Sequence, residues 1–306
     1  MLSEKQKLKK QIVNCLAFCK KYISFLLLFI LLFFSLGFYL YSLQLNPNPV
    51  LVSTKTTLVS SNNPSVTVAH FKNPRLPLQQ PVKVPILTYH YVEVNRDKND
   101  TLRTSMAVTP YFFEKQLQTF LQHGYKVISF RDLTKALEGE EALPPKPVIL
   151  TFDDGYRDFY TDAYPLLKKY QIKATNFVIY NHLGRSGNLT KEQVKEMLAS
   201  GLVTIGSHTL NHANLVTLKP ERARAEILES KKKLEEEFGI KVLDFAYPYG
   251  FYNHQVEELV KEAGYETASS LVVGVQQSSQ NVFHLSRIKV GNYADNFLLS
   301  RLEKFK

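Results

Sequence analysis

Two short segments of this 306-residue chain bring together residue types that bind metals and activate water. Residues 151–156, Thr-Phe-Asp-Asp-Gly-Tyr, place Asp153 and Asp154 side by side where an apolar run ends in a glycine turn. Residues 207–212, Ser-His-Thr-Leu-Asn-His, place His208 and His212 four residues apart after another apolar run. One carboxylate and two imidazoles form a three-ligand metal site with a position open for water, and the second carboxylate can act as a base. The pattern predicts a metal hydrolase.

Each segment alone also has a plainer interpretation. Asp-Gly is a common turn pair, and two histidines are often ordinary surface or core residues. Adjacent carboxylates repel each other, however, and a cation relieves that repulsion. The combination of the acidic turn with the histidine pair therefore favours a metal site over two unrelated structural features.

The elements that must carry these residues alternate between apolar runs and helical patterns. The predicted strands are 84–92, 126–130, 147–152, 174–180, 202–206, 242–248, 265–270 and 284–290. The predicted helices are 110–123, 131–138, 158–170, 190–200, 219–238 and 254–263, of which 219–238 is so charged that it indicates a solvated outer face. Such alternation predicts a parallel sheet, in either a barrel or a doubly wound arrangement. Chemical residues at the C-terminal ends of several strands favour the barrel.

The distribution of charge argues against a nucleic-acid partner. The formal net charge is +10, but residues 1–80 contain nine Lys/Arg and one acid, Glu4. The remaining 29 basic and 27 acidic residues leave only +2 on residues 81–306. A nearly neutral globular part has no electrostatic footprint for a polyanion.

The basic N-terminus is better explained by a membrane anchor. Residues 22–43 are almost continuously apolar, which is long enough to span a bilayer as a helix. The lysines before them predict a cytoplasmic segment at 1–21 by the positive-inside rule. A cleaved signal peptide is the alternative, but the run is long and no small-residue cleavage site follows. Residues 44–82, rich in Pro, Ser, Thr and Asn, then predict an extracellular linker to a catalytic domain at 83–306.

The two chemical segments, together with Ala246-Tyr-Pro-Tyr-Gly250, resemble the first three motifs of the polysaccharide deacetylases, the NodB-like enzymes of carbohydrate esterase family 4. The resemblance covers about residues 83–295. It implies a distorted (β/α)7-type barrel, a divalent metal held by Asp154, His208 and His212, and Asp153 as the base. It also implies that the backbone N–H of Tyr249 stabilises the oxyanion while an acetyl group is removed from a glycan.

The departures from the family pattern concern the residues that assist the base and the leaving group. Ala246 occupies the place where most members have an Arg that orients the base, and Arg287 is a positional candidate to replace it. Two histidines compete for the role of general acid. His284 lies near the C-terminus as in most members, whereas His90 precedes the metal motifs as in poly-N-acetylglucosamine deacetylases, and we favour His90.

The ligand set suits zinc, with cobalt, nickel or ferrous iron as alternatives. The expected enzyme is a monomeric, membrane-anchored, extracellular de-N-acetylase that acts on N-acetylglucosamine in an envelope glycan. An O-acetyl esterase of the xylan type on the same scaffold and an inactive glycan-binding protein are the alternatives. The sequence leaves open whether the glycan is peptidoglycan, a wall polysaccharide or an exopolysaccharide.

Overall fold

The computed structural model describes residues 80–97 and 99–304. The predicted cytoplasmic segment, the predicted anchor at 22–43 and nearly all of the predicted linker lie outside these residues. Within the described part of the chain, no helix has the length and apolarity needed to cross a bilayer.

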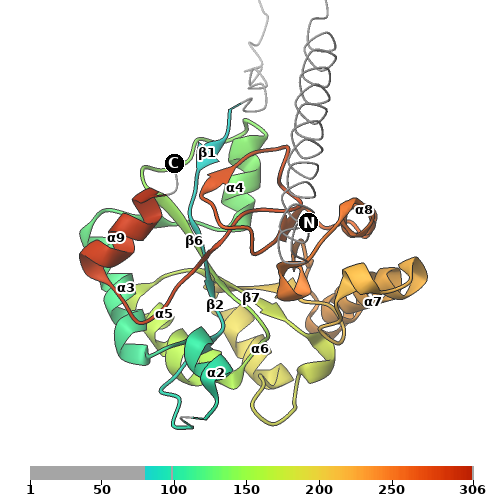
Figure 1. Ribbon diagram of the computed structural model, residues 1–306, viewed down its shortest axis with the longest axis horizontal. Helices are drawn as coiled ribbons and strands as arrows, with labels where there is room; N and C mark the ends of the chain where they lie inside the picture. Colours follow the sequence, from blue (N-terminus) through green and yellow to red (C-terminus); the bar gives the residue numbers. More distant parts are fainter. Residues whose placement is uncertain (1–79, 98, 305–306) are drawn as a thin grey trace, which may run out of the picture. The chain divides into compact units, whose positions relative to one another are not determined.

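The centre of the domain is a curved sheet whose paired strands all run parallel, as the alternation of elements predicts (Figure 1). Its order is β10-β9-β8-β7-β6-β2-β12, and β5 (Lys126–Val127) pairs with the start of β6. The strands are β2 (Ile86–Tyr89), β6 (Pro147–Phe152), β7 (Ala174–Val178), β8 (Val203–Ser207), β9 (Asp244–Ala246), β10 (Thr267–Ser269) and β12 (Ile288–Lys289).

The two edges of this sheet approach each other and give it the form of an incomplete barrel. At one edge β12 pairs with β2, and just before β12 Leu285 forms a single bridge to Ser269 of β10. The Leu285 N–H donates to Ala268 O and the Ser270 N–H donates to Leu285 O. The seam is therefore held by isolated bonds instead of a full ladder, which is consistent with a distorted (β/α) barrel.

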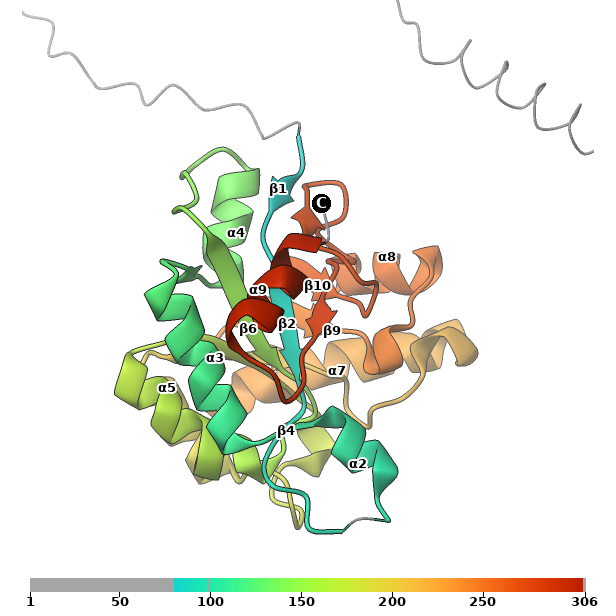
Figure 2. The same cartoon turned by 60° about the vertical axis from the view of Figure 1, so that its left-hand side comes forward.

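Helices cover the outside of the sheet (Figures 1 and 2). They are α3 (Pro110–Gln122), α4 (Phe130–Leu137), α5 (Tyr164–Tyr170), α6 (Lys191–Ala199), α7 (Pro220–Phe238), α8 (His254–Glu262) and α9 (Asp295–Lys304). A π-helical turn, η1 (Phe159–Ala163), leads into α5, and the 3-10 turns are η2 (Tyr180–His182), η3 (Leu215–Thr217) and η4 (Pro248–Gly250). Thr109 caps α3 by accepting from the Phe112 N–H, with Pro110 in the first turn.

Two helices were not predicted. The short α2 (Thr101–Met106), capped by Asp100, buries none of its residues, so no apolar periodicity marks it. The helix α9 buries only Leu298 and Leu302, one residue per turn. In addition, the predicted strand 84–92 is interrupted at His90. There the chain leaves the barrel, and β3 (Tyr91–Val92) pairs with β4 (Ala107–Val108).

Alternate strand residues face two separate apolar layers. Ile86, Ile149 and Phe177 belong to the cluster inside the barrel, whereas their neighbours Leu87 and Leu150 belong to the layer beneath the helices. This period of two directs the side chains that follow Ile149 at even spacing, including that of Asp153, toward the barrel axis. A further antiparallel pair, β1 (Val82–Lys83) with β11 (Gln276–Gln277), lies outside the central sheet.

Candidate active site

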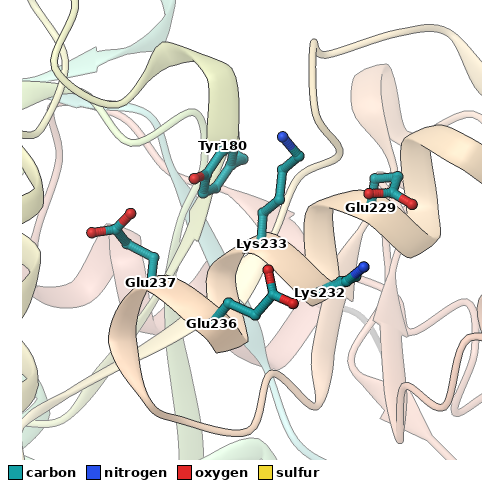
Figure 3. A pocket seen from close by; sticks show the side chains of 6 residues that line it. All are labelled: Tyr180, Glu229, Lys232, Lys233, Glu236 and Glu237. Atoms are coloured by element: carbon teal, nitrogen blue, oxygen red, sulfur yellow. The ribbon is translucent and has the colours of Figure 1, made fainter.

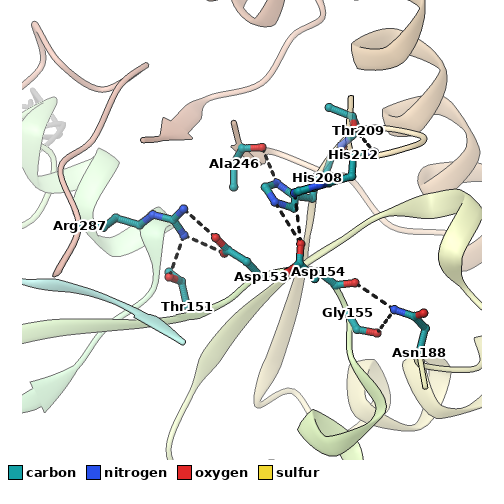
Figure 4. Close-up of polar contacts among 11 residues, drawn as sticks. Thr151, Asp153, Asp154, Gly155, Asn188, His208, Thr209, His212, Ala246 and Arg287 are labelled. Atoms are coloured by element: carbon teal, nitrogen blue, oxygen red, sulfur yellow. Dashed lines mark hydrogen bonds and ion pairs between the residues drawn. The ribbon is translucent and has the colours of Figure 1, made fainter. Parts of the chain in front are cut away.

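The predicted chemical residues lie at the C-terminal ends of parallel strands, or in the segment that closes the sheet. Asp153 and Asp154 follow β6, His208 and His212 follow β8, and His90 follows β2. Parallel strands bring these ends to one rim of the barrel, where loops can present side chains without disturbing the core. The structure therefore gathers residues that are far apart in the sequence (Figure 4).

Asp154, His208 and His212 lie together in a geometry that could hold a metal ion. Asp154 Oδ1 lies 3.5 Å from His208 Nε2 and 3.4 Å from His212 Nε2. One ligand atom from each of the three residues lies within 4.8 Å of the others. Asp154 Oδ1 is buried and has no hydrogen-bond partner in the described part of the chain. A buried carboxylate oxygen without a donor is costly, and a cation would satisfy it.

The His208 imidazole presents its lone pair toward that oxygen. His208 Nδ1 lies 2.7 Å from Ala246 O, and because a carbonyl only accepts, Nδ1 carries the proton and Nε2 is free to bind a metal. Burial lowers the pKa of His208 to about 3, and burial also lowers the pKa of His212. Both rings are therefore neutral at physiological pH, as metal ligation requires.

The donor set fits a divalent cation. Two neutral imidazole nitrogens and one carboxylate oxygen are the ligands of catalytic zinc sites, and they also suit cobalt, nickel or ferrous iron. Burial raises the pKa of Asp154 to about 6, which shows that its charge lacks compensation from the protein alone. A bound cation would supply that compensation.

Asp153 has a different environment from its neighbour. Its two oxygens accept from Arg287 Nη1 and Nη2, each at 2.8 Å, and both side chains are almost fully buried. Arg287 is further fixed by Nε, which donates to Ser270 O, and by Nη1, which donates to Thr151 Oγ1. Burial would raise the pKa of Asp153, but the Arg287 guanidinium and nearby histidines outweigh it and lower the pKa to about 2. Arg287 thus contacts the carboxylate that Ala246 cannot reach.

The two candidate acids have different neighbours. His90 lies close enough to Asp153 and Asp154 to lower the pKa of both, and its buried Nδ1 has no partner among the described residues. His284 Nδ1 instead lies 2.8 Å from Glu257 Oε2 of α8, and its ring stacks on Tyr252 at 5.2 Å. The position of His90 beside the carboxylates supports it over His284 as the acid.

The loops of the rim contain unusual backbone. Among the described residues other than glycine, seven have positive φ. Four of them lie in the three segments that resemble family motifs: Asp154 (74°), Thr209 (68°), His212 (59°) and Tyr249 (60°). Such conformations are costly for side-chain-bearing residues and tend to be retained at functional sites. The Tyr249 ring lies 4.5 Å from the His212 ring, so this residue borders the site.

Supporting residues that the sequence analysis did not identify hold the ligand loops. Glu226 of α7 accepts from the Asn211 backbone N–H at 3.0 Å and from its side-chain amide at 2.7 Å, which fixes the loop between the two histidines. The sequence gives no signal for this role, because a glutamate in a charged helix is expected to be solvated. Glu226 is nevertheless only 9% exposed.

A second supporting group lies beside Asp154. The Tyr156 side chain acts to lower the pKa of Asp154 against the larger effect of burial, and the Tyr156 ring stacks on the Tyr91 ring with 3.9 Å between the ring centroids. The Arg103 guanidinium covers the other face of Tyr91 at 4.4 Å. This column connects the segment containing α2 to the loop that carries one predicted ligand, and no sequence spacing between these residues reveals it.

A surface hollow of about 460 Å³ lies apart from these residues, over α7 and Tyr180 (Figure 3). Its lining consists of Tyr180 and five charged residues of α7: Glu229, Lys232, Lys233, Glu236 and Glu237. Glu237 is already paired with Lys191, and Lys233 lies over the Tyr180 ring at 5.5 Å. None of the three predicted metal ligands lines this hollow.

Comparisons with known proteins identify the family. A model of the polysaccharide deacetylase family matches residues 140–268. The Bacillus subtilis protein YxkH is 34% identical over 212 residues, which cover 69% of this chain and 73% of that protein. The poly-beta-1,6-N-acetyl-D-glucosamine N-deacetylase of Staphylococcus aureus strain MSSA476 is 28% identical over 212 residues, covering 65% and 73% of the two chains.

Solved structures share both the fold and the sequence signal. The Streptococcus pyogenes deacetylase PplD, solved in complex with acetate, is 35% identical with a TM-score of 0.68, covering 72% of this chain and 99% of that chain. IcaB from Ammonifex degensii is 31% identical with a TM-score of 0.61, covering 69% and 93%. The chain belongs to the polysaccharide deacetylases, hydrolases of carbohydrate esterase family 4 that depend on a metal.

Proposed function

We propose that the protein is a membrane-anchored extracellular de-N-acetylase that removes acetyl groups from N-acetylglucosamine residues of an envelope glycan. The observation that carries this proposal is the division of labour between two adjacent carboxylates. Asp154 points an unsatisfied oxygen at two neutral imidazoles, while Asp153 is held ionised by Arg287. The substrate class is supported by the similarity to the staphylococcal poly-beta-1,6-N-acetyl-D-glucosamine N-deacetylase.

The proposed metal ligands are Asp154, His208 and His212. A divalent cation held there would supply Lewis acidity and lower the pKa of a bound water. Zinc is the proposed ion, with cobalt, nickel and ferrous iron as alternatives. All three side chains follow the C-terminal ends of strands, at the rim of the barrel.

The protein's own residues then move two protons. Asp153 accepts a proton from the attacking water while the water oxygen bonds to the acetamide carbonyl carbon. Arg287 keeps the Asp153 carboxylate ionised and oriented for this transfer. The amine leaves only when it is protonated, so His90 donates a proton to the nitrogen as the C–N bond breaks. The Tyr249 backbone N–H is the proposed donor to the oxyanion that forms in between. Acetate and a glucosamine unit are the products.

The sequence pattern of residues 1–82 supports a proposal for the location of the enzyme. We propose a cytoplasmic segment at 1–21, a transmembrane anchor at 22–43, a linker at 44–82 and a monomeric catalytic domain at 83–306 outside the cell. The anchor and the short linker favour the cell's own envelope over an external carbohydrate source as the substrate.

The function is tested by incubating the zinc-loaded full chain with poly-β-1,6-N-acetylglucosamine, peptidoglycan and acetylated xylan, and measuring acetate. Release from an N-acetylated glycan supports the proposal and identifies the glycan. Release from xylan alone would replace it with the O-acetyl esterase alternative. If none of the three glycans releases acetate although the protein has bound its metal, the result would indicate a glycan-binding protein instead.

A further inference from the structure

The proposed general acid, His90, has no side-chain partner that orients its ring. Its buried Nδ1 forms no hydrogen bond within residues 80–97 and 99–304. A catalytic imidazole must hold one orientation to deliver its proton, and a partner on the second ring nitrogen commonly provides it. For His90 the backbone on either side must take over this role. On the N-terminal side that backbone is fixed to the proposed base, because the Asp153 N–H donates to Tyr89 O at 3.0 Å.

On the C-terminal side of His90 the chain leaves the barrel, and a buried carboxylate holds it there. The backbone N–H of Val92 donates to Asp158 Oδ2, and Asp158 is only 9% exposed. Burial raises the pKa of Asp158 to about 6, so its charge is placed there at a cost in free energy. The proposed reaction assigns this carboxylate no step. Its observed contact is with the second residue after the acid.

Tyr91, the residue directly after His90, is held between two flat groups. The Tyr156 ring stacks on it with 3.9 Å between the ring centroids and an interplanar angle of 21°. The Arg103 guanidinium lies over the Tyr91 ring at 4.4 Å from its centroid, a favourable cation–π distance. Tyr91 is buried, so these contacts restrict both the ring and the backbone that carries it.

Arg103 is itself fixed within the segment that contains α2. Its Nε and Nη2 donate to the two carboxylate oxygens of Glu93, the second at 2.7 Å. Its backbone N–H donates at 2.9 Å to Asp100, the residue that caps α2. The helix lies beyond the C-terminal end of β2 (Figures 1 and 2) and buries none of its own residues. Its defined contribution is thus the guanidinium that it places over Tyr91.

We propose that Arg103 and Asp158 are positioning residues for His90. Through Tyr91 and Val92 they fix the backbone that carries the acid, and they thereby align its ring with the leaving nitrogen. This inference rests on the proposed function. A general acid that is turned away from the nitrogen slows the departure of the amine. The attack of water depends on Asp153 instead and should proceed as before.

The test compares two substrates that differ in their need for an acid. Zinc-loaded full-length protein carrying Arg103→Met is assayed with N-acetylglucosamine oligomers and with 4-nitrophenyl acetate, whose leaving group departs without protonation. We expect kcat to fall about tenfold for the glycan and to change by less than about twofold for the ester. Arg131→Met is the matched control, because Arg131 is an exposed arginine of α4 that pairs with Glu266.

Two substitutions of Asp158 test the second contact. Asn retains an oxygen that can accept from the Val92 N–H, whereas Leu does not. Asp158→Leu should therefore lower glycan turnover selectively, and Asp158→Asn should recover most of it. In protein that already carries His90→Gln, Arg103→Met should cause no further loss, because no acid is left to align.

Three results would overturn the positioning role. The first is an equal loss on both substrates in Arg103→Met, which would indicate a general structural defect. The second is unchanged glycan turnover in both Arg103→Met and Asp158→Leu. The third is a full further loss when Arg103→Met is added to His90→Gln.

A measurement without turnover separates this inference from the proposed function. If the unaltered protein hydrolyses the ester but releases no acetate from any glycan, the proposed function fails. The alignment of His90 is then judged by NMR of histidine-labelled protein, in which the His90 ring signal is identified by its loss in His90→Gln. We expect this signal to shift in Arg103→Met and to stay in place in Arg131→Met. An unshifted signal in Arg103→Met would overturn the positioning role as well.

Discussion

Arg287 and Asp153, 134 residues apart in sequence, form a two-oxygen ion pair at 2.8 Å inside the barrel rim. Arg287 comes from the segment that closes the sheet, directly before β12, and Asp153 follows β6. The pair therefore couples completion of the barrel to the ionisation of the proposed base. The two adjacent aspartates therefore have different environments, since Asp153 faces an arginine and Asp154 faces two imidazoles.

Replacing Arg287 by Met should destabilise the protein and reduce turnover together. Removal of one partner of a buried ion pair leaves an uncompensated charge and typically costs about 3–5 kcal/mol. Urea unfolding measures this loss, and adding Asp153→Asn to Arg287→Met should recover much of it. Arg131→Met is the matched control, because the Arg131–Glu266 pair is exposed and such pairs contribute about 0–1 kcal/mol. Equal losses in the two single variants would contradict a special role for Arg287.

Metal content should distinguish the two aspartates. We expect His212→Ala and Asp154→Asn to lose most of the bound zinc, because each removes one of three ligand atoms. Asp153→Asn should retain zinc while losing turnover. His254→Ala is the control, since His254 is largely exposed on α8. Elemental analysis of the purified proteins gives the answer, and zinc retained in both ligand variants would refute the assigned site.

His90→Gln should remove the general acid. Loss of a positioned acid typically lowers kcat by about 10²–10⁴-fold, with zinc content unchanged. An acetyl ester with a good leaving group, such as 4-nitrophenyl acetate, needs no protonation, so hydrolysis of this ester should fall far less. His284→Gln serves as the comparison and should affect glycan turnover only slightly. A large loss in His284→Gln and a small one in His90→Gln would reverse the assignment.

Much of this architecture can be predicted from the sequence because its signals are local. The Thr109-Pro110 start of α3, the apolar runs of β6 to β8 and the ligand pair His208 and His212 are each defined within a few residues. The partner of Asp153 was only a positional guess, because it depends on how the last strand closes the sheet.

Other features escaped prediction because their causes are tertiary. Glu226 lies in a helix whose charge indicates a solvated face, yet it is buried against Asn211. The strand predicted at 84–92 breaks at His90 because the following residues pair with β4 outside the barrel. The burial of Glu226 and the strand break at His90 leave no trace in the apolar pattern of the sequence, from which the elements are predicted.

Asp244 provides a pH-dependent test of the fold away from the site. Burial raises its pKa to about 6, although Thr267 donates a hydrogen bond to it. The folded state thus binds the proton more tightly than the unfolded state. Protonated Asp244 therefore stabilises the folded state. This stabilisation is complete when the pH is below the pKa of Asp244 in the unfolded chain, which is near 4, and it is lost as the pH rises through the pKa of about 6 in the folded protein.

Asp244→Asn should therefore stabilise the protein at pH 8 by about 1–3 kcal/mol and much less at pH 4.5. Urea unfolding at the two pH values measures the difference. Asp97→Asn, at an exposed position, is the control. A stabilisation of Asp244→Asn that is equal at both pH values would contradict the raised pKa.

The most direct test of the account is acetate release from N-acetylglucosamine oligomers by the zinc-loaded full chain, measured beside Asp153→Asn with zinc content determined in both. The account predicts acetate from the unaltered protein and full zinc content but a loss of at least about a hundredfold in turnover in the variant. Equal acetate release from both proteins would contradict the central claim that Asp153 is the base.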